Sequence, residues 1–328
     1  MNEQNTNQRI LKNINNRAPG SLTKQDLLDA YNFFKGKCPY SETKINQEDW
    51  HLEHIIPVSM GGTTDPWNCI PVCGPCNLSK GGDHLLDWWD KTHTKDEEYK
   101  LENILVYILK KLSEPRNYRI TTIEDKEIIK LIGEERKIEE EQQFNDENYI
   151  HITKKLDTFT FLRQVLDHLT DSKMISPERL IQYNVMLEEI QTKNKELGKL
   201  DIEVYDQQKR LTKYLKELGV IKHYSIVYEY SDKIGNIEEI KKNVEEIQEY
   251  IGKDSISDLI NKNPEILFMN VRDFSSKLEY IVNVLGISLN VFLERPTIIN
   301  QTESLRKLLE TCEKNDVNIN DIPNWAYL

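Results

Sequence analysis

Three pairs of residues that interrupt regular structure divide the region 38–82 into short pieces: Gly61-Gly62, Asp65-Pro66 and Gly74-Pro75. Gly and Pro are the strongest local breakers of helices and strands, and short apolar runs between them are typical of β-strands. We therefore predict a strand within His51–Val58, a loop, a second strand over Cys69–Val72, and a short helix that starts near Pro75.

Outside this region the sequence favours helices. Thr23 and Asp26 have the spacing of a capping box, so a short helix is expected over Thr23–Lys35. Beyond Lys95, apolar residues recur at the spacing of one helix face. Further helices are predicted for Tyr99–Lys111, Leu156–Leu169, Pro177–Leu197, Ile202–Leu218 and Ile237–Ile251. The predicted fold class is α+β, with a small strand-containing front and a mainly α-helical remainder that packs as a coiled coil or helical bundle.

A weak internal repeat is present near the C-terminus. Leu259-Ile260, Pro264 and Ile266-Leu267 are followed, 32 residues later, by Val291-Phe292, Pro296 and Ile298-Ile299. Repeats of this period indicate stacked helical units. The segment 263–287 resembles the repeats of mitochondrial transcription termination factors, a likeness that covers less than a quarter of the chain.

Charge is distributed unevenly between the two parts of the chain. Residues 1–95 carry 10 Lys and Arg against 11 Asp and Glu, whereas the remainder carries 33 against 44, and the whole chain has a net charge of −12. An acidic surface repels a polyanion, so the back half is not expected to provide the main grip on nucleic acid. We expect it to bind a protein partner or to self-associate.

Neither a membrane span nor an export signal is expected. The chain has no run of about eighteen apolar residues, which a transmembrane helix requires, and Met1–Arg17 has no apolar core segment. The expected location is the cytoplasm, where clustered cysteines more often bind a metal than form disulfides.

The chemistry of phosphodiester hydrolysis singles out Glu53, His54 and Asn77. A neutral imidazole can activate water near pH 7, and carboxylate and amide oxygens are ligands that Mg²⁺ and Mn²⁺ prefer. The prediction places Glu53 and His54 at the end of the first strand and Asn77 on the helix after the second strand. A hairpin and a helix could therefore bring all three to one phosphate.

The order of these residues closely resembles the HNH endonuclease family. The shared elements are Glu53-His54, an Ile-x-Pro, a Gly-Gly loop, Asn68, and Cys-x-x-Cys-Asn-x-x-Lys-Gly from Cys73 to Gly81. The resemblance implies a ββα-metal fold that cuts DNA, with His54 as general base and Glu53 and Asn77 as ligands of Mg²⁺ or Mn²⁺. It also implies that Asn68 holds the loop in shape and that Lys80 contacts a backbone phosphate.

A structural zinc site is also implied, because many members of this family carry two Cys-x-x-Cys knuckles. Cys73 and Cys76 form an intact second knuckle, whereas the first reads Cys38-Pro39-Tyr40-Ser41. Zinc could bind through Cys38, Cys73 and Cys76 with a fourth ligand such as His51 or Glu42, or with water as the fourth ligand. Alternatively, zinc could be lost and the cysteines retained as small buried residues. We favour a retained zinc.

These features predict five segments: a polar N-terminal segment (1–22), the nuclease domain (23–95), a helix and charged linker (96–150), a helical or coiled-coil region (151–254) and a small helical domain (255–328). The favoured function is an active DNA endonuclease whose helical part senses or docks a partner, as in a phage-encoded or phage-defence effector. The alternatives are a non-catalytic zinc-ribbon-like binding module and a homing or restriction enzyme, which would need a basic recognition surface.

Overall fold

The computed structural model describes residues 20–46, 50–114, 156–193, 201–252 and 255–314. The predicted N-terminal segment and the charged linker therefore lie mostly outside the described residues. The chain divides into two compact units, residues 1–205 and 206–328, and each is described by itself. The five predicted segments stay a prediction, because they divide the chain more finely than these two units.

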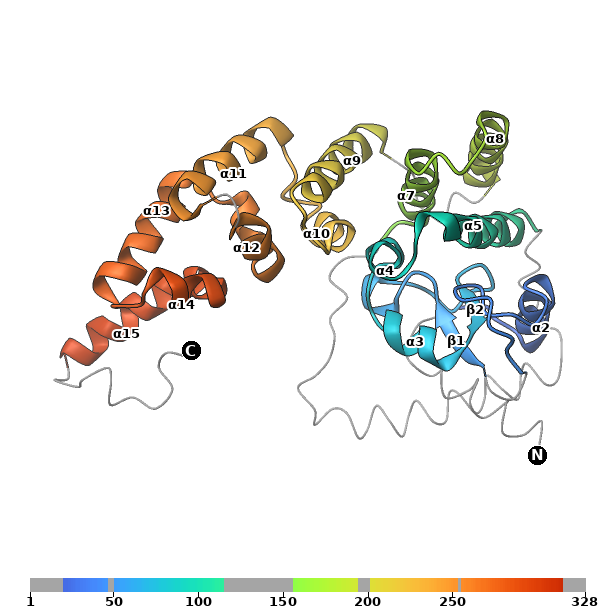
Figure 1. The fold of residues 1–328 in the computed structure, drawn as a ribbon, viewed down its shortest axis with the longest axis horizontal. Coiled ribbons are helices and arrows are strands. Elements are labelled where there is room, and N and C mark those ends of the chain that lie inside the picture. The colour runs from blue at the N-terminus through green and yellow to red at the C-terminus, as the bar shows by residue number, and fades with distance from the viewer. Residues whose placement is uncertain (1–19, 47–49, 115–155, 194–200, 253–254, 315–328) are drawn as a thin grey trace. The chain divides into compact units, whose positions relative to one another are not determined.

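The first unit combines a two-stranded hairpin with helices (Figure 1). Its elements are α2 (Lys24–Phe33), β1 (His51–His54), the 3₁₀ helix η1 (Val58–Met60), β2 (Cys69–Val72), α3 (Gly74–Lys80), α4 (Leu85–Thr92), the 3₁₀ helix η2 (Lys95–Glu97), α5 (Glu98–Ser113), α7 (Thr158–Asp171) and α8 (Pro177–Lys193). The predicted order of hairpin and short helix, followed by a mainly helical region, is confirmed.

The hairpin and α3 form the small ββα arrangement. β1 and β2 pair antiparallel, with His51 opposite Val72 and His54 opposite Cys69. All four residues of β2 are buried. Helix α2 packs against this strand through Leu27. Thr23 caps the start of α2 in a complete capping box. Buried apolar contacts therefore hold the hairpin on one side, while α3 contacts β1.

Helices α4 and α5 belong to the same compact unit as the hairpin. The Tyr107 hydroxyl on α5 donates a hydrogen bond to the carbonyl oxygen of Pro66 at 2.7 Å, just before β2. The indole N–H of Trp88 on α4 donates to Ser79 on α3 at 3.0 Å. These contacts connect the loop and the helix of the ββα arrangement to the helical part of the unit.

The second unit is a series of alternating longer and shorter helices, in which Gly219, Gly252 and Gly286 are 33 and 34 residues apart. Its elements are α9 (Ile202–Glu217), which starts in the last residues of the first unit, α10 (His223–Glu229), α11 (Ile237–Ile251), α12 (Ile256–Lys262), the 3₁₀ helix η5 (Pro264–Phe268), α13 (Val271–Glu279), the π-helix η6 (Tyr280–Val284), α14 (Leu289–Glu294), the 3₁₀ helix η7 (Pro296–Gln301) and α15 (Thr302–Lys314).

Glycines mark the period of this repeat. Gly219, Gly252 and Gly286 follow the ends of α9, α11 and η6, and all three have positive φ angles of 81°, 88° and 68°. Each is followed by a short helix with a buried apolar residue at an equivalent position: Ile226, Leu259 and Phe292. Pro264 and Pro296, which correspond in the internal repeat of the sequence, each start a 3₁₀ helix.

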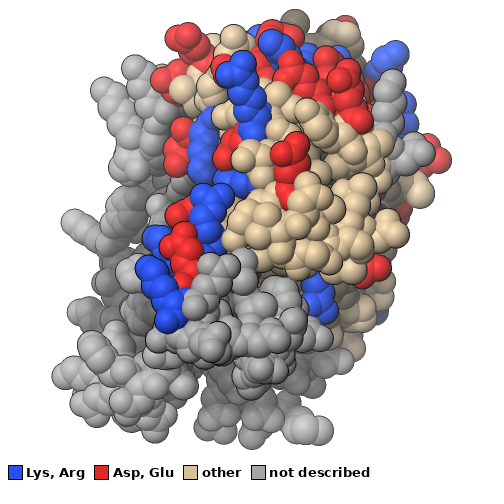
Figure 2. All heavy atoms as spheres, turned by 90° about the vertical axis from the view of Figure 1, so that its left-hand side faces the viewer, with Lys and Arg blue, Asp and Glu red and all other residues tan. Residues whose placement is uncertain are grey.

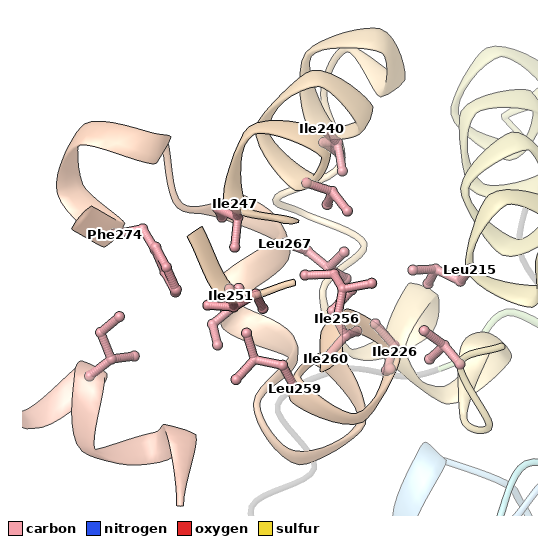
Figure 3. Close-up of a cluster of buried hydrophobic side chains, with 14 of the residues drawn as sticks. Leu215, Ile226, Ile240, Ile247, Ile251, Ile256, Leu259, Ile260, Leu267 and Phe274 are labelled. Atoms are coloured by element: carbon pink, nitrogen blue, oxygen red, sulfur yellow. The ribbon is translucent and has the colours of Figure 1, made fainter. Parts of the chain in front are cut away.

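One apolar core runs through these repeats. Side chains from α9 to η7 form a single buried cluster, and Figure 3 shows those of α11 and α12 directed toward one another. The amide of Asn263, which is buried, donates to the Pro296 carbonyl and exchanges hydrogen bonds with Asn300, so neighbouring repeats are joined by polar contacts as well. Such a stack needs its neighbours to bury the apolar face of each repeat.

Within the described residues, none of the helices combines the length and apolar composition that a bilayer crossing requires. On the face drawn in Figure 2, acidic and basic side chains lie next to one another along the top and the left, and residues of other types cover the centre and the right.

Candidate functional site

The loop between β1 and β2 is held in shape by Asn68. This residue is fully buried; its side-chain oxygen accepts the N–H of Ile56 at 2.7 Å, and its amide N–H groups donate to the carbonyl oxygens of Ile56 and Thr63 at 3.1 and 2.9 Å. The turn requires a glycine at position 62, because a Cβ there would lie 1.9 Å from the Ile56 carbonyl oxygen. The geometry of Asn68 is that of a positioning residue, since its polar atoms bond backbone groups of the loop.

The face of β1 that meets α3 carries His51 and Glu53. Alternate residues of a strand share a face, and on α3 the residues Asn77 and Lys80 share a face because they are three positions apart. The Asn77 amide nitrogen lies 3.4 Å from His51 Nδ1. Lys80 Nζ lies 2.6 Å from Glu53 Oε1. The β1–α3 interface therefore brings a carboxylate, an amide, an imidazole and an ammonium group together.

The position of Lys80 differs from the prediction that it contacts a phosphate. Its side chain is buried, and Nζ bonds Glu53 and also donates to the carbonyl oxygen of His54 at 3.2 Å. In this structure the ammonium group faces protein oxygen atoms, and its contact with a phosphate stays a prediction. The physical reason is that Glu53 is itself buried, and a buried carboxylate requires a partner of opposite charge.

Burial and Lys80 act on Glu53 in opposite directions. Removal from water disfavours the carboxylate and raises its pKa, while the ammonium of Lys80 works against this increase, and the pKa remains above its ordinary value. Lys80 thus partly offsets the cost of keeping a negative charge at this position.

His54 lies at the end of β1, and its ring contacts Thr64. His54 Nε2 is 3.0 Å from the Thr64 hydroxyl oxygen, and Thr64 is buried. Burial, assisted by the charge of Lys80, lowers the pKa of His54 from 6.5 to about 4. The imidazole is therefore neutral near pH 7, which is the form that can accept a proton.

The structure brings some of the predicted site residues together and separates others. Glu53 and Asn77 share the β1–α3 interface, whereas His54 is bonded to the loop residue Thr64. Among the described residues, no hydrogen bond or ion pair joins the side chain of His54 to that of Glu53 or Asn77. The contacts of His51 with Asn77 and of Lys80 with Glu53 were not predicted from the sequence, although the helical spacing of Asn77 and Lys80 indicates that both face the same strand.

Three thiols converge beside the N-terminus of α3. The sulfur atoms of Cys38, Cys73 and Cys76 lie within 4.8 Å of one another. A hydrogen bond between Cys38 and Cys76 lowers the pKa of Cys38 to about 4 and raises that of Cys76. Such a cluster, in which one thiol already favours the thiolate, suits a soft or borderline cation such as Zn²⁺.

Comparison with known proteins agrees with this geometry. The sequence profile of the HNH endonucleases matches residues 37–83, which contain the thiol cluster, the hairpin and α3. Residues 37–83 form an HNH endonuclease domain. The ββα order, the Asn68 contacts and the thiol cluster all lie inside this match.

One relative is YoqL of Bacillus subtilis (strain 168), which is described as an SPbeta prophage-derived putative HNH endonuclease. It is 30% identical to this chain over 83 residues, which are 22% of this chain and 35% of the relative. The match thus spans about a third of the relative's length. No solved structure matched the chain.

Proposed function

We propose that the HNH domain hydrolyses phosphodiester bonds in DNA with the aid of Mg²⁺ or Mn²⁺. The observation that carries the proposal is the β1–α3 interface, where Glu53 and Asn77 offer a carboxylate and an amide oxygen next to the strand end that bears a neutral His54. Oxygen donors of these two kinds fit a hard cation. When bound, such a cation supplies positive charge to the scissile phosphate and to the leaving oxygen.

The roles of the protein groups follow from their chemistry. Glu53 and Asn77 would hold the cation, and the neutral His54 imidazole would take a proton from water, with its ring orientation fixed by Thr64. Asn68 would keep the loop that carries Thr63 and Thr64 in place. Lys80 would hold the Glu53 carboxylate through Oε1, which leaves the second carboxylate oxygen for the cation.

A cleavage assay with matched variants tests this function. Plasmid DNA is incubated with the purified protein and Mg²⁺ or Mn²⁺, and nicked and linear products are measured. His54→Ala and Asn77→Ala should each lower the rate by at least roughly a hundredfold, the scale expected for loss of a general base or of a metal ligand. Asn32→Ala, which changes an exposed residue on α2, should cut like the wild type. Equal rates for the wild type and His54→Ala with both metals would refute the proposal.

A second candidate is a non-catalytic binding module, and the Glu53–Lys80 ion pair favours it. Lys80 already neutralises the carboxylate that a cation would need, and His54 bonds Thr64 instead of facing Asn77. Such a module would bind DNA without turnover, and His54→Ala would not alter the binding. Gel-shift and cleavage assays on the same preparation distinguish the two functions.

We assign the helical second unit to partner binding, and the prophage origin of the relative supports a phage-associated role for the whole chain. Retention of a tagged second unit by a defined partner, with no retention of the first unit, would support this assignment. Strong binding of DNA by the second unit alone would contradict it.

A further inference from the structure

The first knuckle of the thiol cluster keeps its shape although it lacks the second cysteine. A bridge between Lys37 and Lys44 closes it, the Cys38 N–H donates to the Thr43 carbonyl oxygen at 2.8 Å, and the Glu42 N–H donates to the Cys38 carbonyl oxygen at 2.8 Å. Glu42 adopts a positive φ of 59° within this turn. Ser41 is therefore held three residues after Cys38, where a Cys-x-x-Cys knuckle has its second sulfur.

The Ser41 hydroxyl points into the cluster. Its oxygen lies 3.7 Å from the sulfur of Cys73. In a tetrahedral zinc site with Zn–S distances of about 2.3 Å and a Zn–O distance of about 2.1 Å, neighbouring sulfur and oxygen ligands lie about 3.6 Å apart. The observed spacing is close to that of two ligands of one zinc ion.

The two side chains that the sequence suggested as the fourth ligand are placed differently. The carboxylate of Glu42 accepts a hydrogen bond from the Tyr99 hydroxyl at 2.6 Å, and His51 Nδ1 faces Asn77. Among the His, Cys, Asp and Glu side chains of the described residues, the group of ligand atoms that meets here consists of the three thiols alone.

We propose that Ser41 supplies the fourth ligand of a three-thiolate zinc site and thereby makes the zinc exchangeable. A neutral hydroxyl binds Zn²⁺ less strongly than a thiolate does, because it brings no negative charge and is a harder donor. Ser41 is also exposed, whereas Cys38 is buried, so solvent or a competing ligand reaches the site at its weakest bond. The concentration of free zinc would then determine how firmly the first knuckle, residues 38–41, is held against α3.

Zinc release measures this directly. The zinc-loaded full-length chain is mixed with a chromogenic chelator under reducing conditions, and the release rate is followed for the wild type, Ser41→Cys, Ser41→Ala and Ser41→Thr. Ser41→Cys should release zinc more slowly and Ser41→Ala faster, each by roughly tenfold or more, because changes even outside the ligand shell alter metal affinity on that scale. Ser41→Thr keeps a hydroxyl and should stay close to the wild type.

The controls separate this inference from the proposed nuclease function. Ser276→Ala, at an exposed serine on α13, and His54→Ala should both release zinc like the wild type, because the assay does not depend on DNA cleavage. In the Co²⁺-substituted protein, Ser41→Cys should intensify the sulfur-to-metal absorption by about one third, from three thiolates to four. The inference is overturned if the wild type binds no zinc, or if Ser41→Ala and the wild type release zinc at the same rate.

Discussion

Lys80 Nζ lies 2.6 Å from Glu53 Oε1, and the two residues are only 1% and 4% exposed. Removing one partner of a buried ion pair leaves an uncompensated charge, which costs about 3–5 kcal/mol. We therefore expect Lys80→Met to lower the free energy of unfolding by about this amount. Urea denaturation monitored by tryptophan fluorescence gives the measurement, because Trp88 and Trp89 are buried in the same unit.

The pair of Lys91 and Asp83, in the same unit, provides the control for this prediction. These residues are 3.4 Å apart and each side chain is 32% exposed, so Lys91→Met should cost less than about 1 kcal/mol. The double variant Glu53→Gln, Lys80→Met removes both charges and should be more stable than Lys80→Met alone. If the losses in the free energy of unfolding caused by Glu53→Gln alone and by Lys80→Met alone add up to the loss in the double variant, a direct interaction between the two residues is contradicted.

Asn68→Ala should strongly destabilise the first unit. The change removes two hydrogen bonds to backbone groups of the buried Ile56 and one to the half-buried Thr63, and each buried group left without a partner costs about 1–3 kcal/mol. We expect a loss of about 3 kcal/mol or more in the free energy of unfolding. Asn32→Ala changes an exposed residue on α2 of the same unit and should remain within about 0.5 kcal/mol of the wild type. A similar loss in both variants would show that the loop contacts contribute nothing specific.

The local elements were largely predictable from the sequence. β2 occupies Cys69–Val72 as expected, β1 lies within the predicted His51–Val58, and α11 spans the predicted Ile237–Ile251. Breakers, helix spacing and caps act over a few residues, so they can be read from sequence alone. The expected helix Thr23–Lys35 is shorter in the structure, Lys24–Phe33, because Thr23 serves as its N-cap.

The contacts of the site were less predictable, because they join residues that are far apart in the chain. Lys80 and Glu53 are 27 positions apart, and Ser41 and Cys73 are 32 apart. Strand alternation assigns Glu53 to a face, but the register of α3 on β1 decides whether Asn77 or Lys80 meets it. The repeat of the second unit was visible only in part, since the shared feature is the positive φ of its glycines and not a common motif.

The low pKa of His54 makes a prediction about stability and pH. Burial and Lys80 lower this pKa to about 4 from an ordinary value of 6.5. Between these values the unfolded chain binds a proton that the folded protein does not bind. The contribution to stability is therefore complete above about pH 6.5 and is lost as the pH falls toward about 4.

Comparison with a variant that does not titrate isolates this effect. The unfolding free energies of the wild type and His54→Gln are measured at roughly pH 7 and pH 4.5. The wild type should lose on the order of 2–3 kcal/mol more than the variant over this range. A difference between the two proteins that does not change with pH would contradict the burial of His54.

The packing of α5 predicts how much of the chain the nuclease needs for folding. Tyr107 on this helix donates to Pro66 and its ring contacts those of Phe33 and Phe34 on and after α2, at centroid distances of 5.3 Å. A fragment of residues 20–95 lacks these contacts and exposes the apolar surface that α5 covers. It should show no cooperative unfolding, whereas residues 20–205 should unfold cooperatively. A cooperative transition in the shorter fragment would instead support a domain boundary near residue 95.

The glycines of the second unit allow a comparison within one scaffold. Gly252 has a φ of 88° and Gly235 does not have a positive φ, and an added Cβ would meet no atom within 4 Å at either position. Any difference between Gly252→Ala and Gly235→Ala must therefore come from the backbone and not from crowding. Gly252→Ala should cost about 1–3 kcal/mol through strain, while Gly235→Ala should be neutral or stabilising by up to about 1 kcal/mol, because alanine restricts the unfolded chain. Thermal unfolding of the isolated second unit measures both; if Gly252→Ala is neutral, the glycine at the end of α11 is not required for the turn into the next repeat.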